Sequence, residues 1–107
     1  MATNRREVVE GVQYQGVDEA IGYTVDVSAL MPTPSDAPSA VVAVVKDDHG
    51  TAVTATVMPT NAPSVADGVI SLSPLRSLVA GVLYRVEVRY DIGGNTLESY
   101  FYVQAEV

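Results

Sequence analysis

The chain has 107 residues, no cysteine and a formal charge of −7, and 48% of its residues are hydrophobic against 18% charged. This length supports one domain that buries roughly 65% of the surface exposed by the unfolded chain, and this composition argues against disorder. Disulfides and zinc–thiolate sites are excluded, the scattered basic residues predict no nucleic-acid partner, and no apolar run is long enough to predict a membrane span.

Apolar residues recur with period two in short blocks rich in Val, Thr and Tyr, separated by Pro, Gly, Asp and Asn. Because this alternation is typical of β-strands, we expect seven of them. In chain order they span residues 8–15, 20–28, 40–46, 52–58, 68–72, 83–90 and 97–107. Seven short strands predict an all-β domain over residues 8–107, an immunoglobulin-like or fibronectin type III-like antiparallel β-sandwich. Residues 1–7 have no apolar pattern and are expected to form a flexible N-terminal arm.

Three segments depart from this pattern. Residues 40–45 are apolar without alternation, which fits either a central strand or a strand whose outer face is covered by another chain. The proline-rich segments 31–39 and 59–66 are expected to be loops, because proline cannot donate a hydrogen bond to a sheet. Residues 73–78, with Pro74 after a serine, predict at most one helical turn.

The last two blocks carry the strongest local signal. Gly93 and Gly94 predict a tight hairpin turn with positive φ. The register that follows separates charged from apolar side chains: Arg89 opposite Glu98, Val88 opposite Ser99, Glu87 opposite Tyr100, Val86 opposite Phe101 and Arg85 opposite Tyr102. A slide by two residues would place Asp91 opposite Glu98, a repulsive pair, so this register is preferred.

No group of residues predicts catalysis, cofactor binding or a metal site. The single histidine, His49, lies in a turn with Asp47, Asp48 and Gly50, and the alternating acids of a calcium loop are missing. No Gly-x-Ser-x-Gly motif accompanies that histidine, and no helix follows the Gly93–Gly94 pair to form a phosphate site. The chain is therefore not expected to be an enzyme.

Tyrosines at two places predict different roles. Tyr84 opens a strand after a Leu-rich segment, which predicts a tyrosine corner whose buried ring bonds to upstream backbone through its hydroxyl. Tyr100 and Tyr102 lie on the other face of their strand from Phe101, so their rings should point outward. We expect a cation–π contact between Arg85 and Tyr102, and we predict an interaction surface formed with Arg89. Arg5 and Arg6 of the arm are further candidates for contact with an acidic neighbouring subunit.

Residues 75–88 resemble the corner between strands E and F of immunoglobulin-like and fibronectin type III modules. A longer likeness covers about residues 18–107 and includes Gly22-Tyr23-Thr24-Val25-Asp26-Val27-Ser28, Ala55-Thr56-Val57, Gly68-Val69-Ile70 and Gly81-Val82-Leu83-Tyr84-Arg85-Val86. This order is similar to small immunoglobulin-like virion proteins of tailed phages, of the fiber-tail adaptor, neck or decoration type. Those proteins usually have a tryptophan where this chain has Val27.

The resemblance implies a non-enzymatic structural protein of a virion, made in the host cytoplasm and placed at the neck, tail or capsid surface. Its implied partners are other virion proteins and copies of itself, so a homo-oligomer is expected in the particle, with no cofactor. The alternative is an adhesion or carbohydrate-binding sandwich module, for which the same fold and the outward tyrosines would serve a sugar ligand. That alternative predicts a monomer, and portal, terminase and tail genes next to this gene would favour the virion protein.

Overall fold

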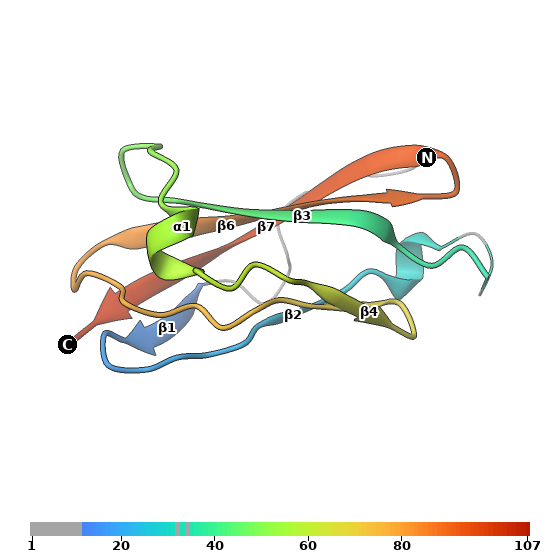
Figure 1. Ribbon diagram of the computed structural model, residues 1–107. Coiled ribbons are helices and arrows are strands. Elements are labelled where there is room, and N and C mark those ends of the chain that lie inside the picture. The colour runs from blue at the N-terminus through green and yellow to red at the C-terminus, as the bar shows by residue number, and fades with distance from the viewer. Residues whose placement is uncertain (1–11, 32, 34) are drawn as a thin grey trace.

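The computed structural model describes residues 12–31, 33 and 35–107, and these residues form a two-layered sandwich (Figure 1). Its elements in chain order are β1 (Gln13–Gly16), β2 (Thr24–Asp26), the 3-10 turn η1 (Ser28–Leu30), β3 (Ser39–Lys46), α1 (Thr54–Val57), β4 (Ser64–Ala66), β5 (Val69–Ser71), β6 (Leu83–Ile92) and β7 (Asn95–Glu106). The prediction of an all-β sandwich of about seven strands is confirmed. The expected arm, residues 1–7, and the start of the first expected strand lie outside the described residues.

Four strands form the larger sheet in the order β1-β7-β6-β3, and three form the smaller sheet in the order β2-β5-β4. The orders β7-β6-β3 and β2-β5-β4 correspond to strands G, F, C and B, E, D of a constant-type immunoglobulin sandwich. One pairing differs from the antiparallel sandwich that was expected, because β1 runs parallel to β7. β1 and β7 are far apart in the chain and no hairpin joins them, so the connection does not require an antiparallel pair.

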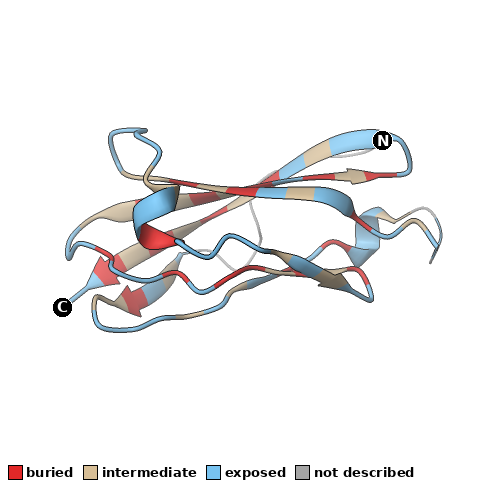
Figure 2. Ribbon diagram, in the orientation of Figure 1, coloured by how far each residue is buried: buried red, intermediate tan, exposed pale blue. Residues whose placement is uncertain are grey.

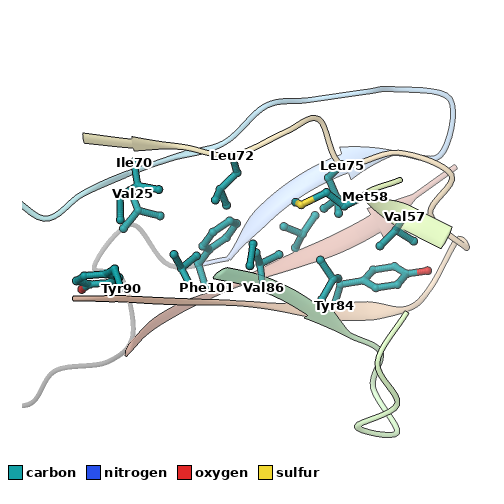
Figure 3. Packing of buried hydrophobic residues seen from close by; sticks show 14 of the residues in the cluster. Val25, Val57, Met58, Ile70, Leu72, Leu75, Tyr84, Val86, Tyr90 and Phe101 are labelled. Carbon is teal, nitrogen blue, oxygen red and sulfur yellow. The ribbon is translucent and has the colours of Figure 1, made fainter. Parts of the chain in front are cut away.

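The core lies between the two sheets and follows the alternation of β6. Tyr84, Val86, Val88 and Tyr90 are buried, whereas the residues between them are partly or fully exposed (Figure 2). In Figure 3 Val86 and Phe101 of the larger sheet face Val25, Ile70 and Leu72 on the side of the smaller sheet. Burying a side chain of this size contributes about 1.5 to 3 kcal/mol, so this layer supplies the main folding energy of a chain without disulfides.

A polar network joins the two sheets at one side of the core. Gln15 of β1 is buried, and its Nε2 donates hydrogen bonds to the carbonyls of Leu75 and Glu19 at 2.6 and 2.9 Å. Its Oε1 accepts a hydrogen bond from the hydroxyl of Tyr23 at 2.9 Å. Burial, and secondarily the carboxylate of Glu19, raises the pKa of Tyr23 above its ordinary value. The buried amide is therefore satisfied from both layers, which lets a polar residue occupy the core side of β1.

The strand expected at residues 52–58 is wrong. These residues form a bridge at Ala52, followed by the single turn α1, which buries Val57 and the adjacent Met58. The β-branched residues of this segment favour a strand, but a strand would point the neighbouring side chains of Val57 and Met58 to opposite faces. The turn and its end bring both into the core, and this packing outweighs the local preference. Figure 3 shows Val57 and Met58 at one end of the core.

The loop expected at residues 59–66 is wrong at its end, where Ser64–Ala66 forms β4 and pairs with β5. The connection is Asp67-Gly68, with φ of 52° and 77°, and positive φ at both positions is what a two-residue hairpin turn requires. A Cβ on Gly68 would lie 2.8 Å from the Cβ of Ser28, so this glycine also permits a close approach of η1. An Asp-Gly pair is a known hairpin signal, but the strands on either side have only three residues each and show too little alternation for the hairpin to be recognised from the sequence.

Residues 73–78 do not form the single helical turn considered from the sequence. Leu75 instead makes an isolated antiparallel bridge with Ile21, and the Ser73 hydroxyl accepts a hydrogen bond from the Ala62 backbone N–H at 2.9 Å. Extended backbone here extends the pairing of the smaller sheet toward β1 and places Leu75 in the core. No helix within the described residues has the length and apolar character needed to cross a membrane.

Among the described residues β3 is an edge strand, and not the central strand considered for residues 40–45. The segment that follows it nevertheless bonds outward backbone groups of Val45 and Ala43. The Val45 N–H donates to Thr54 Oγ1 at 2.9 Å, the Val45 carbonyl accepts from the Val53 N–H at 2.8 Å, and the Ala43 carbonyl accepts from Asn61 Nδ2 at 3.0 Å. Residues 53–61 thus cover the backbone of this edge, while the outer face of β3 stays apolar.

Candidate functional site

The register expected for the last hairpin is confirmed, and it arranges the outer face of the larger sheet. β3 continues each of these rungs, because Val42, Val44 and Lys46 lie opposite Arg89, Glu87 and Arg85. We use the name outer-face patch for the nine side chains on three successive rungs: Lys46–Arg85–Tyr102, Val44–Glu87–Tyr100 and Val42–Arg89–Glu98.

Charged side chains occupy the middle of the outer-face patch. Lys46 Nζ lies 3.3 Å from Glu87 Oε1, and Arg85 Nε lies 2.9 Å from Glu87 Oε2. The Arg85 Nε–H is not directed at that oxygen, so the second contact is an ion pair without a well-formed hydrogen bond. Partly exposed pairs of this kind contribute about 0 to 1 kcal/mol. Their main effect is to hold the side chain of Arg85 in one position.

The aromatic contact expected between Arg85 and Tyr102 forms with a different ring. The Arg85 guanidinium carbon lies 3.9 Å above the centre of the Tyr100 ring, and Tyr100 in turn meets Tyr102 edge to face at 5.6 Å. Tyr102 is the direct neighbour of Arg85 across the ladder, but Glu87 draws the guanidinium along β6, toward the rung of Tyr100. Both tyrosines are half-buried, so their rings are held in place while part of each remains open to a partner.

Tyr14 extends the outer face beyond β7. It lies opposite Gln104, and 64% of its side chain and backbone surface is exposed. The sequence does not reveal this residue as outward, since an apolar tyrosine between two glutamines would be expected to face the core. The buried amide of Gln15, with three hydrogen bonds, takes that place instead. An internal network therefore turns an additional ring outward.

The outer-face patch differs in charge from the rest of the molecule. It holds three bases and two acids, whereas the other described residues hold one base, Arg76, and nine acids. The patch is thus slightly positive in a chain of formal charge −7. Arg85 and Arg89 lie in it as expected, while Arg5 and Arg6 lie outside the described residues.

The residues singled out for structural roles have the geometry described for such roles. Tyr84 is buried, and its hydroxyl accepts a hydrogen bond at 2.9 Å from the backbone N–H of Val79, five residues upstream. This is the arrangement of a tyrosine corner. Gly93 and Gly94 have φ of 56° and 84°, as the two-residue turn requires.

Asp47, Asp48 and His49 bring their ligand atoms within 4.8 Å of one another. Asp47 Oδ1 already accepts hydrogen bonds at 2.9 Å from the backbone N–H groups of His49 and Thr51, and Asp48 Oδ1 lies 2.9 Å from His49 Nδ1. These contacts shape an exposed turn after β3, as an aspartate at the start of a turn commonly does. The absence of metal, cofactor and catalytic residues stays a prediction.

Comparison of the chain with protein families, curated proteins and solved structures found no match.

Proposed function

We propose that this protein is a non-enzymatic structural subunit of a phage virion, an immunoglobulin-like adaptor or decoration protein that acts through protein–protein contacts at the neck, tail or capsid surface. The observation that carries the proposal is the outer-face patch, in which Arg85, Tyr100 and Tyr102 hold one another in place on a sheet face. Arg and Tyr are enriched in protein interfaces, and ordered side chains lose little entropy on binding. The resemblance of residues 18–107 to small virion proteins supplies the context.

The apolar outer face of β3 supports the same proposal. Val42 is 42% exposed, and Val44 beside it is half-buried, so apolar surface on this face remains open to a partner. β3 lies at the edge of the larger sheet among the described residues, so of the two explanations considered for the apolar block we propose the second, a face that another chain covers. The two valines on β3 and the two tyrosines on β7 form apolar margins on either side of the charged side chains of β6. This layout suits a protein partner.

A sugar ligand is the alternative, and one contact disfavours it. Stacking of a sugar ring requires an open aromatic face, but the guanidinium of Arg85 covers one face of Tyr100, and Tyr102 packs against the same ring in a T-shaped contact. Tyr14 is the tyrosine of this face with the most open ring. Binding of a sugar that is lost in Tyr14→Ala would favour the alternative.

The double variant Tyr100→Ala/Tyr102→Ala tests the proposal. It should fold, since neither ring belongs to the core, and its incorporation into particles should fall by at least about tenfold, because truncating a central interface tyrosine often costs about 2 kcal/mol. Incorporation is measured from the protein content of purified particles, and location from electron micrographs of labelled subunits. Leu30→Ala is the matched control, because it shortens an exposed apolar side chain of the η1 turn. Incorporation of the double variant at the wild-type level would contradict the proposal.

A further inference from the structure

The direction of the strands collects acidic side chains at one end of the sandwich. β1 runs parallel to β7, and both β3 and β7 run antiparallel to β6, so the carboxyl ends of β1, β3 and β7 lie together. Figure 1 shows the turns after β1 and β3 and the C-terminus at this same end. The acids that follow or close these strands form what we name the acidic end: Asp18, Glu19, Asp47, Asp48 and Glu106.

The acidic end and the outer-face patch have opposite charge and point in different directions. The patch faces outward from the sheet and has more bases than acids, while the acidic end terminates the strands and carries five carboxylates. Asp18, Glu19, Asp48 and Glu106 are exposed, and only Asp47 is half-buried. With three bases and two acids each patch is net positive, so two copies placed face to face repel one another weakly, whereas the patch and the acidic end attract.

We propose that the outer-face patch of one copy binds the acidic end of a second copy. The inference rests on the proposed function, since it names the partner of the same surface. Lys46 and Arg89 would meet carboxylates of the neighbour. Tyr100 and Tyr102 would be covered by the turns of the neighbour that carry these carboxylates. Such a contact joins two different surfaces, so it propagates from copy to copy and yields a closed ring or an open filament rather than a two-fold dimer.

Charge reversal separates this contact from others. The patch variant is Lys46→Glu/Arg89→Glu, which leaves Arg85 on Tyr100. The end variant is Asp18→Lys/Asp48→Lys, which gives up the exposed contact between Asp48 and His49 but keeps the two hydrogen bonds that Asp47 accepts in the same turn. Self-association of the full chain is measured by sedimentation velocity. We expect the wild type to associate, each variant alone to weaken association by at least tenfold, and an equimolar mixture of the two variants to restore it.

The restored mixture is the decisive result, because the patch variant keeps a wild-type acidic end and the end variant keeps a wild-type patch. Each reversed surface then meets a surface of opposite charge on the other variant. Asp26→Lys/Asp67→Lys is the control for net charge. It changes the charge from −7 to −3, as the end variant does, but near the β4–β5 turn at the opposite end (Figure 1). Because Asp26 Oδ1 accepts hydrogen bonds from Ser28 and Asp67 has a positive φ, a circular dichroism melt first checks that this control folds. This control should associate like the wild type.

Three results would overturn the inference: an end variant that associates like the wild type, a mixture that fails to associate, or a wild type that stays monomeric at millimolar concentration. A circular dichroism melt of each variant checks folding, and Lys46→Gln/Arg89→Gln replaces the patch variant if that variant unfolds. A monomeric wild type whose Tyr100→Ala/Tyr102→Ala variant still loses incorporation would refute the contact between copies and leave the proposed function standing.

Discussion

The β6–β7 and β4–β5 hairpins both turn through two residues with positive φ, Gly93-Gly94 in the first and Asp67-Gly68 in the second. They differ in what surrounds the turn. The β6–β7 strands pair over ten rungs, and Gly94 meets nothing within 4 Å where a Cβ would be placed. The β4–β5 strands pair over three rungs, and Gly68 lies against η1. A long hairpin is held by its own ladder, whereas a short one depends on its neighbours.

The largest effect is expected where the turn is enclosed. Gly68→Ala should destabilise the protein by about 3 kcal/mol, because it combines the cost of positive φ with overlap against Ser28. Gly94→Ala should cost only about 1 kcal/mol, since its Cβ would extend into open space. Urea melts of both variants measure the difference. Equal losses would mean that the environment of the turn does not distinguish the hairpins.

The hydrogen bond between Tyr84 and Val79, at the base of the β6–β7 hairpin, is expected to be the polar contact of this hairpin whose loss lowers stability most. Tyr84→Phe removes the acceptor of the Val79 N–H and should cost about 1 to 2 kcal/mol, as an unsatisfied partly buried donor does. The variant keeps the ring, so packing is preserved and the loss reports the hydroxyl. A denaturation midpoint unchanged from the wild type would show that the corner adds nothing to the β6–β7 ladder.

The network that joins the two sheets should respond to pH. Because the pKa of Tyr23 is raised, its folded form keeps the proton when the unfolded chain begins to lose it near pH 10, so this contribution to stability falls as pH rises from there through the folded pKa. Tyr23→Phe should cost about 1 kcal/mol at neutral pH and should remove this part of the alkaline decline. Melts at neutral and alkaline pH measure both effects. An alkaline decline as steep in the variant as in the wild type would contradict the assignment.

The smallest effect is expected at the edge of the larger sheet. Ala40 has φ of 52° at an irregularity in the pairing of β3, where glycine would remove strain but add freedom to the unfolded chain. We expect Ala40→Gly to stabilise the protein by about 0.5 kcal/mol. The control Ala43→Gly, in the regular and buried part of the same strand, should destabilise it. Calorimetric melts of the two variants should therefore shift in opposite directions.

The two hairpins also show what a sequence reveals. The β6–β7 register was predictable because alternation continues over many residues and a two-residue slip creates a like-charge pair. The β4–β5 hairpin was missed, since three-residue strands carry too little alternation and Pro63 suggested a loop. The strand predicted at 52–58 was wrong for the opposite reason. Its local pattern is typical of a strand, but the burial of Val57 and Met58 favours a helical turn.

The candidate site was predictable in composition but not in contacts. Strand parity placed Arg85, Arg89, Tyr100 and Tyr102 on one face, and the structure agrees. It could not show that Glu87 would direct Arg85 to Tyr100, nor that a buried glutamine would turn Tyr14 outward. Both depend on hydrogen bonds and ion pairs between residues that are distant in the chain or on different strands.

The covered edge of β3 bears on aggregation. An open edge strand is a template for pairing with any other extended chain, especially when its residues are apolar and lack charge, as those of 40–45 do. A foreign strand would have to displace the bonds that Thr54, Val53 and Asn61 make to Val45 and Ala43. The apolar face of this strand is thus open to the side chains of a partner, while residues 53–61 hinder amyloid-like pairing with the part of its backbone at Ala43 and Val45.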